Sequence, residues 1–178
     1  MLMMVECMRY VLIVEVNNMN TTEMEVAISK YFGIRKHVIV PNVSWGLGLH
    51  ECDLLILSNS NYATEVEIKI SLADLKKDKE KRHGHRSKKI KYLYFAIPSK
   101  LAKHIEYIPL RAGVLVVNSK GKVFCIAKPV HNKGCRKFEQ REVNKMLELG
   151  IMRTWKLKEK NVSHKKTIKQ LKEKVWSY

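Results

Sequence analysis

The sequence predicts a mixed α/β protein, built around one central sheet that is flanked by helices. Three observations favour this class. Short apolar or alternating runs indicate strands, helical patterns with capping residues alternate with them, and the 178 residues suit one domain with a tail. The predicted order is helix, three strands, helix, strand, and then further strands and a helix. Residues 1–150 are assigned to the α/β domain, and residues 151–178 to a basic, helical C-terminal tail.

The first predicted elements are an apolar strand at residues 10–16 and a helix that begins soon after it. Thr22 and Glu25 have the spacing of a capping box, with Thr22 as the N-cap. The apolar stripe of this helix continues to Phe32, and Gly33 is a suitable residue to end it.

Three strands are predicted next. Residues 37–40, three of which are β-branched, form a strand that is stopped by Pro41, and a Gly-rich loop with Trp45 follows. Residues 51–57 and 64–70 are strands joined by a tight turn.

Another helix is predicted to begin at Ser71, because its spacing to Asp74 is that of a capping box. Pro98 closes the buried strand that comes after it. The remaining predicted elements are a short helix, two strands that form a hairpin and an amphipathic helix, at residues 100–105, 113–117, 122–127 and 138–149.

Positive charge dominates the composition. Lys and Arg number 34 against 17 Asp and Glu, so the net charge is +17. Residues 76–91 and 153–178 each carry nine cations and two anions, or net +7, and together they hold 14 of the 17 excess charges. Such an excess favours a polyanionic partner, with nucleic acid ranked before an anionic membrane surface.

No apolar run reaches membrane-spanning length, and no signal-peptide pattern is found, so we expect a cytoplasmic protein. Cys125, His131 and Cys135 lie close in sequence but have no obvious fourth partner, and no zinc site is predicted from them.

The alternating strand at residues 64–70 carries the chemistry. Glu65, Glu67 and Lys69 share one of its faces. Asp53 lies 14 residues before Glu67, so a hairpin symmetric about Ser60 places the two carboxylates opposite each other, with Cβ atoms about 5 Å apart. Opposed carboxylates repel, and the repulsion predicts that Glu67→Gln gains stability in metal-free buffer.

A divalent cation between Asp53 and Glu67 would remove this repulsion. Oxygen ligands favour Mg²⁺, with Mn²⁺ as a substitute. Lys69 could then orient or deprotonate an attacking water and offset the charge that grows on a phosphate. These are the requirements of phosphodiester hydrolysis, although the same pattern also occurs on solvated strand faces.

Asp53 followed by Glu67-Ile68-Lys69, in the order helix, three strands, helix, strand, resembles the PD-(D/E)XK nuclease superfamily. The likeness is closest to the MmcB-like DNA repair group and its phage relatives, and it covers residues 20–118. Cys52 stands where the superfamily name has Pro. The resemblance implies a restriction-endonuclease-like core and a Mg²⁺-dependent endo- or exodeoxyribonuclease. It also implies a prokaryotic or phage-encoded protein that acts in DNA repair or recombination.

The same resemblance implies site residues. Asp53, Glu67 and the carbonyl of Ile68 are expected to hold the metal, and Lys69 to serve the nucleophilic water. An acid of the first helix often joins such sites. Glu23 is preferred for this role because Glu25 already has a capping explanation.

Basic residues after Ser71 and the loop before Asp53 are expected to contact nucleic acid. Trp45 could stack on a base or cover the core. His83 and His85 are interpreted as solvated side chains of the lysine-rich stretch. The residues predicted to bind nucleic acid are Trp45, Lys76, Lys77, Lys81, Arg82, Arg86, Lys88 and Lys89.

The expected partner is DNA, with RNA as the alternative. No membrane partner is expected, and a homodimer remains open. A second hypothesis is a non-catalytic basic nucleic-acid-binding module on the same fold, and a third is a basic adaptor that docks on another protein or a membrane. Salt-dependent binding without cleavage would favour the second hypothesis.

Overall fold

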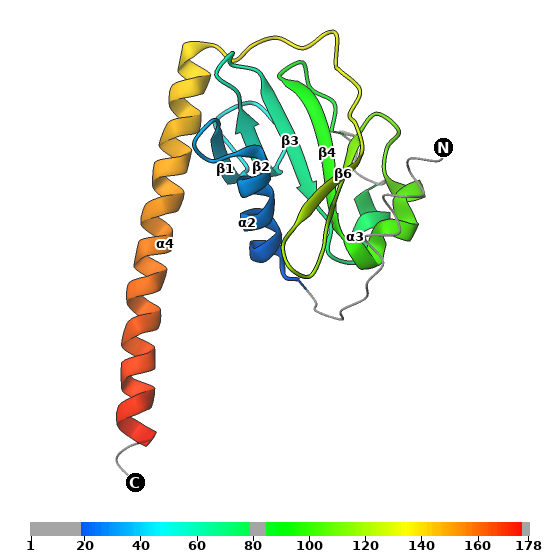
Figure 1. Ribbon diagram of the computed structural model, residues 1–178. Coiled ribbons are helices and arrows are strands. Elements are labelled where there is room, and N and C mark those ends of the chain that lie inside the picture. Colours follow the sequence, from blue (N-terminus) through cyan, green and yellow to red (C-terminus); the bar gives the residue numbers. More distant parts are fainter. Residues whose placement is uncertain (1–18, 79–84, 176–178) are drawn as a thin grey trace.

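A computed structural model describes residues 19–78 and 85–175. Within these residues a mixed sheet has the strand order β1-β2-β3-β4-β5-β6 (Figure 1). Strands β1 to β3 are antiparallel, β3 to β5 are parallel, and β6 is antiparallel to β5. The predicted mixed α/β class is therefore confirmed, whereas the strand expected at residues 10–16 lies outside the described residues. The strands are β1 (Val38–Val43), β2 (Cys52–Leu57), β3 (Ala63–Ile68), β4 (Ile90–Pro98), β5 (Gly113–Val117) and β6 (Val123–Ala127).

The hairpin of β2 and β3 has the predicted register. Its pairs run from Leu57 opposite Ala63 to Leu54 opposite Val66, and all of them are symmetric about residue 60. Extending this register by one position places Asp53 opposite Glu67. The turn between the strands is closed by Ser58, whose backbone N–H donates to Tyr62 over 3.0 Å.

Strand β1 is longer than predicted because Pro41 does not end it. Pro41 pairs with Leu54 inside the strand. Since β1 is at the edge of the sheet, a residue without an N–H is tolerated there.

One face of the sheet is covered by α2 (Thr21–Phe32). Its buried residues, Met24 and Ile28 among them, join a core cluster with Val66 and Ile68 of β3. The N-cap differs from the prediction. Asn20 caps the helix, and its side chain accepts the backbone N–H of Glu23, which completes the capping box.

The opposite face is covered by three other elements. Leu75 of α3 (Leu72–Lys77) and Leu101 of the 3₁₀ segment η2 (Ser99–Tyr107) pack on β4 and β5, in one cluster with Phe95. Further along the sheet, α4 (Gln140–Val175) packs Met146 and Leu149 against β1 and β2. The side chains of β3 that face this side are therefore enclosed.

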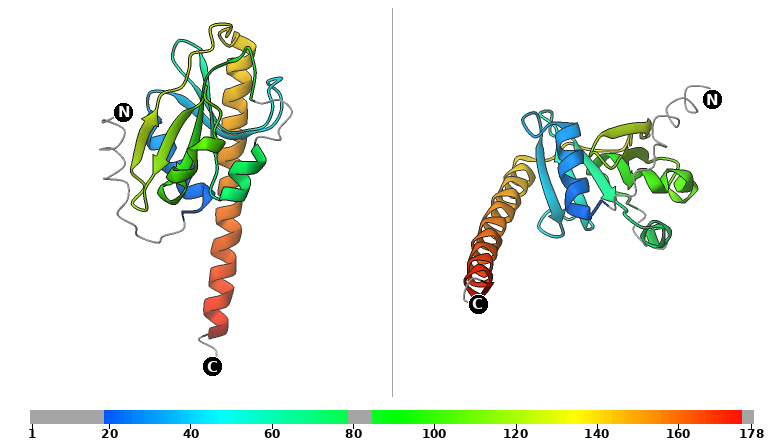
Figure 2. Two further views of the ribbon diagram at one scale, coloured as in Figure 1. Left: turned by 90° about the vertical axis from the view of Figure 1, so that its right-hand side faces the viewer. Right: turned by 60° about the horizontal axis from the view of Figure 1, so that its bottom comes forward.

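Helix α4 is one continuous helix where two helical segments were expected. Its first turns pack on β1, and the remainder projects away from the body of the protein (Figures 1 and 2). The boundary predicted between residues 150 and 151 falls inside it, and residues 154–173 are exposed. In the described part of the chain, no helix combines the length and apolar character needed to cross a membrane.

Candidate functional site

The charged side of β3 lies inside the protein. Glu65 and Glu67 are 0% and 1% exposed, and Lys69, directly after the strand, is 4% exposed. Ionised side chains are costly to bury unless they are paired and hydrogen-bonded. The interpretation of this face as solvated is thus excluded, and the partners of these residues define the site.

Lys69 is held between two carboxylates. Its Nζ atom lies 2.9 Å from Oε2 of Glu67 and 3.0 Å from Oδ1 of Asp78. Burial alone would lower the pKa of Lys69, but the attraction of Glu67 and the hydrogen bonds outweigh it and raise that pKa above its ordinary value. Asp78 is shifted the other way, because hydrogen bonds with His85 and Lys69 overcome its burial and lower its pKa. Lys69 is therefore a fixed ammonium that can orient and stabilise anions, but it is unsuited to accept a proton.

His85 is the centre of the cluster, contrary to its interpretation as a solvated residue. It is 1% exposed, with Nδ1 at 2.6 Å from Oε1 of Glu65 and Nε2 at 2.8 Å from Oδ2 of Asp78. Burial opposes protonation, yet the hydrogen bonds with Asp78 and Glu65 raise the pKa of His85 to about 9. The backbone φ of His85 is +55°, in the left-handed region that residues other than glycine rarely adopt. Such unfavourable backbone conformations cluster at functional sites.

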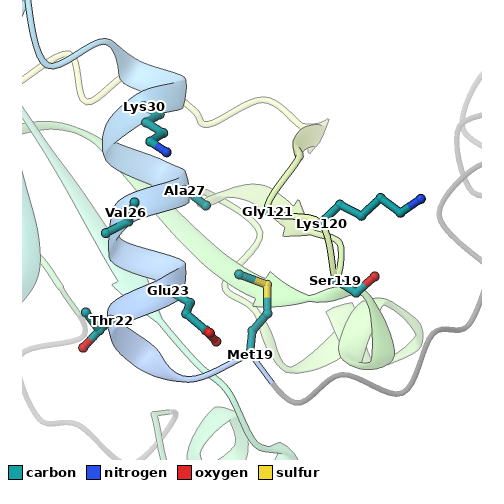
Figure 3. A pocket seen from close by; sticks show the side chains of 9 residues that line it. All are labelled: Met19, Thr22, Glu23, Val26, Ala27, Lys30, Ser119, Lys120 and Gly121. Carbon is teal, nitrogen blue, oxygen red and sulfur yellow. The ribbon is translucent and has the colours of Figure 1, made fainter.

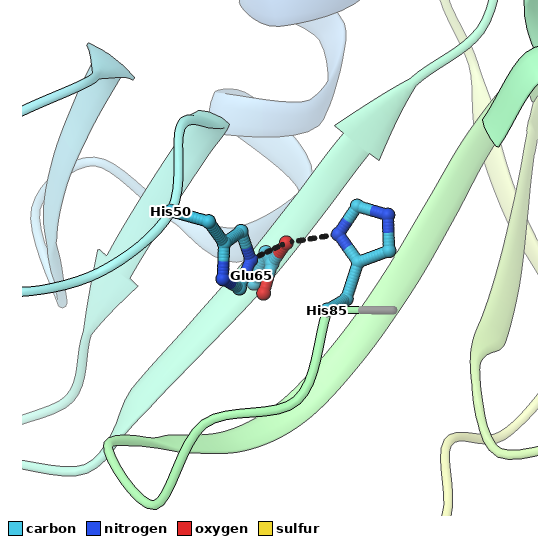
Figure 4. Close-up of side chains that lie close together, drawn as sticks. All are labelled: His50, Glu65 and His85. Carbon is cyan, nitrogen blue, oxygen red and sulfur yellow. Dashed lines mark hydrogen bonds and ion pairs between the residues drawn. The ribbon is translucent and has the colours of Figure 1, made fainter. Parts of the chain in front are cut away.

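His50 closes the cluster on the other side of Glu65. Its Nε2 atom lies 2.7 Å from Oε1 of Glu65, so both histidines meet one carboxylate oxygen (Figure 4). Burial would raise the pKa of Glu65, but hydrogen bonds with His50 and His85 lower it instead. His50 and Asp78 carry no sequence signal of their own for this site, because each is joined to β3 by the fold rather than by a local motif.

Asp53 occupies the end of the hairpin. It is half-buried, and its Oδ2 accepts the backbone N–H of Ile68 at 2.7 Å, just beyond the last ladder pair, Leu54 with Val66. The structure thus brings Asp53 to the Glu67–Ile68 peptide, and Lys69 follows immediately. The predicted group of Asp53, Glu67, Ile68 and Lys69 gathers at one end of β3, although the Glu67 side chain is directed to Lys69.

Glu23 is not part of this group, which corrects the prediction. Its Oε2 accepts the backbone N–H of Asn20, and α2 packs on the sheet face opposite to Glu67. Glu23 instead lines a pocket between α2 and the turn of β5 and β6, with Lys120 and Gly121 (Figure 3).

Glu25 is the acid of α2 that reaches the Asp53 end of the sheet. Its Oε1 accepts from Nδ2 of Asn42 at 3.4 Å, and the register of β1 with β2 puts Asn42 opposite Asp53. Burial is the main reason why the pKa of Glu25 is raised. The preference for Glu23 over Glu25 came from placing the capping box two residues too late.

The residues predicted to bind nucleic acid fall into four groups. Lys89 is engaged inside the protein, where its Nζ lies 2.9 Å from Glu142 and also donates to the carbonyl of Leu47, so it is not presented to a ligand. Trp45 is half-exposed, and Nζ of Lys145 lies 4.2 Å from its ring centroid. Lys81 and Arg82 lie outside the described residues. The remaining members are exposed, namely Lys76, Lys77, Arg86 and Lys88.

Comparisons with known proteins bear on the fold. No protein-family model and no curated protein matches the chain. Among solved structures, it is similar to the SPO1766 protein of unknown function from Silicibacter pomeroyi, with a TM-score of 0.57 and 12% sequence identity. The match covers 80% of this chain and 90% of that one. The two proteins share a fold. At this identity the likeness extends no further than the architecture.

Proposed function

We propose that this protein is a metal-dependent nuclease that hydrolyses phosphodiester bonds of DNA in repair or recombination. The observation that carries the proposal is the meeting of Asp53, the Glu67–Ile68 peptide and Lys69 at the end of β3. The order of helix, three antiparallel strands, helix and parallel strand is the one that the PD-(D/E)XK resemblance implies.

The donors at this position fit Mg²⁺. Asp53, Glu67 and the Ile68 carbonyl offer oxygen atoms alone, which is the ligand type that Mg²⁺ prefers. A carboxylate has about four acceptor positions, so the single hydrogen bond from Ile68 to Asp53 leaves it able to ligate. When bound there, Mg²⁺ would polarise a phosphoryl oxygen and lower the pKa of a bound water.

The protein's own groups supply positioning and charge. Asp53 and Glu67 lie on adjacent strands at one end of the hairpin, and holding an ion between them would require the Glu67 carboxylate to turn from Lys69. Lys69 keeps its proton, and its buried ammonium supplies a fixed positive charge beside this position, which offsets the negative charge that develops on a phosphate. The exposed Lys76, Lys77, Arg86 and Lys88, together with the basic part of α4, can neutralise backbone phosphates without reading sequence.

A second candidate function is a non-catalytic nucleic-acid-binding module. One observation favours it. The ammonium group of Lys69 already lies between Glu67 and Asp78, so these carboxylates have a positive partner without a metal ion. On this hypothesis the cluster stabilises the fold, and the basic surfaces alone act on nucleic acid.

A nuclease assay in Mg²⁺ or Mn²⁺, on single-stranded, duplex, flap and junction DNA, tests the first proposal. Asp53→Asn should lower turnover by about 10²–10³-fold, because it removes a ligand charge at the reacting centre. The matched control is Asp74→Asn, which changes an exposed carboxylate at the start of α3 and should cut as well as wild type. Wild-type protein that binds DNA but cuts none of these substrates would support the binding module instead.

A further inference from the structure

A group of two histidines and one carboxylate lies beside the proposed nuclease centre. Nε2 of His50, a carboxylate oxygen of Glu65 and Nδ1 of His85 all lie within 4.8 Å of one another. They come from the loop before β2, from the middle of β3 and from the turn that leads to β4. None of these atoms belongs to the Asp53, Glu67 and Ile68 set.

His85 is oriented as a metal-ligating histidine is. Metal-bound histidines almost always donate their second ring N–H to a carboxylate or carbonyl, which fixes the tautomer and directs the other nitrogen to the ion. Nε2 of His85 lies 2.8 Å from Oδ2 of Asp78, so Nδ1 is the nitrogen that faces Glu65 and His50. Asp78 is anchored in turn by Lys69 at 3.0 Å.

Glu65 supplies an independent observation. The residue is fully buried, and its Oε2 has no hydrogen-bond partner among the described residues, while Oε1 takes both histidines. A buried carboxylate oxygen without a partner is costly and calls for an explanation such as an ion.

A second set of possible ligands, which combines Glu67, Asp78 and His85, is less suitable. The ammonium group of Lys69 lies within 3.0 Å of both carboxylates and already provides the positive charge there. Glu65 forms ion pairs with His50 and His85, and the guanidinium of Arg111 also attracts it. In the described part of the chain, however, no ammonium group lies between Glu65 and a second carboxylate as Lys69 does.

We propose that His50, Glu65 and His85 form a binding site for a divalent transition metal of the Zn²⁺ type. Two imidazoles and one carboxylate are a donor set that zinc uses in catalytic centres, with a fourth position left for water or substrate. The nitrogens now lie 2.7 and 2.6 Å from Oε1 of Glu65. Ligands at zinc bond lengths are about 3.3 Å apart in a tetrahedron, so metal entry requires each nitrogen to move away from this oxygen by less than about 1 Å. The two nitrogens already lie within 4.8 Å of each other. This site is distinct from the proposed Mg²⁺ position and does not depend on nuclease activity.

Zn²⁺ titration of the full-length protein by calorimetry, after treatment with a chelator, tests the proposal. We expect one equivalent to bind, and His50→Ala to weaken binding at least tenfold, since it removes a ligand at the edge of the cluster where folding is least disturbed. Asp78→Asn should weaken binding by about 10–100-fold through the orientation of His85. The matched control is His131→Ala, because Nε2 of His131 and Sγ of Cys135 lie 4.0 Å apart and offer a competing surface pair.

Equal binding by His50→Ala and wild type, loss of binding in His131→Ala, or no stoichiometric binding by wild type would each overturn the proposal. The absorption spectrum of the Co²⁺-loaded wild-type protein gives a readout that needs no variant. Nitrogen and oxygen ligation predicts visible d–d bands without a thiolate charge-transfer band, whereas a thiolate band would assign the metal to a cysteine site and overturn the proposal.

Discussion

Nδ1 of His85 lies 2.6 Å from Oε1 of Glu65, so the chain after α3 is attached to the middle of β3. This contact joins residues 20 positions apart, and the ring of His85 lies between two acidic side chains, Glu65 and Asp78. The polar cluster is therefore part of the framework that connects α3 to the sheet, as well as a candidate site. Substitutions in it will change stability and function together, and the experiments have to separate the two.

Glu67→Gln should destabilise the protein, although repulsion between opposed carboxylates predicts the reverse. The Glu67 carboxylate forms a buried ion pair with Lys69, and its loss leaves the buried ammonium with Asp78 alone, which we expect to cost about 3 kcal/mol. Urea unfolding in metal-free buffer measures this change in the free energy of unfolding. Glu51→Gln, at an exposed carboxylate just before β2, is the control and should be nearly neutral. A Glu67→Gln protein as stable as wild type would mean that Lys69 is satisfied by Asp78 alone.

Glu142 should give the protein a component of acid sensitivity. The carboxylate receives Arg136 at 2.7 Å through both guanidinium NH groups and Lys89 at 2.9 Å. The Arg136 hydrogen bonds, which outweigh the partial burial, lower the pKa of Glu142 to about 2. Because this folded-state pKa lies below the unfolded value, the stabilisation is complete above about pH 4.5 and is lost as the pH falls towards 2.

The difference in unfolding free energy between wild type and Glu142→Gln measures this component. With allowance for solvent screening of the Arg136 pair, we expect this difference to be about 1–2 kcal/mol at pH 6. The difference should decrease as the pH falls through the acid range. Glu148→Gln is the matched control on the same helix, because Glu148 pairs with the nearby Lys145 in an exposed setting. A difference that stays constant from pH 6 to pH 2 would contradict the assigned cause.

Deletion of the chain after Thr154 should weaken DNA binding and flatten its salt dependence, with little loss of stability. Residues 154–173 are exposed, so the core clusters lose no buried residue of this segment. Each lost phosphate contact should reduce the slope of log affinity against log salt by about 0.9. Fluorescence anisotropy across a salt series, together with thermal melting, checks both statements.

A triple substitution tests the effect of charge on DNA binding without shortening the helix. Changing Lys165, Lys166 and Lys169 to Gln keeps the helix but removes three cations, and it should reduce the slope by part of the effect of the deletion. Lys120→Gln, on the turn between β5 and β6, is the control for the loss of a cation outside both basic runs. An unchanged slope in the deletion protein would remove α4 from the binding surface.

The hairpin could be predicted because its determinants are local. Alternation fixes which side of β3 is charged, and the short turn after Leu57 fixes the register, so the opposition of Asp53 and Glu67 follows from the sequence. The antiparallel pair of β5 and β6 was predictable for the same reason, whereas the parallel pairs of β3 with β4 and of β4 with β5 join strands that are separated by helices. The capping box was placed two residues too late because Asn20 with Glu23 and Thr22 with Glu25 have equal spacing, and only packing on the sheet selects the first.

The remainder of the cluster could not be predicted from local patterns. His85 follows a lysine-rich stretch whose composition indicates exposure, yet its ring is enclosed by contacts with Glu65 and Asp78. His50 belongs to a loop, and only the fold brings it to Glu65. The alternation of Glu65 with Glu67 was the one sequence signal for this site, since two acids on one buried face require partners from elsewhere in the chain.

The projecting part of α4 has a consequence for the mechanics of the molecule. Residues 154–173 span about 30 Å at the rise of an α-helix, and their exposed side chains receive no support from a core. Most helical stability in proteins comes from packing, and lysines four residues apart, such as Lys165 and Lys169, lie on one face of the helix and repel one another. The helical order of residues 154–173 therefore depends on the salt concentration. Counterions or a bound polyanion screen the lysines and stabilise this part of the helix, and low salt destabilises it. The sheet is not affected.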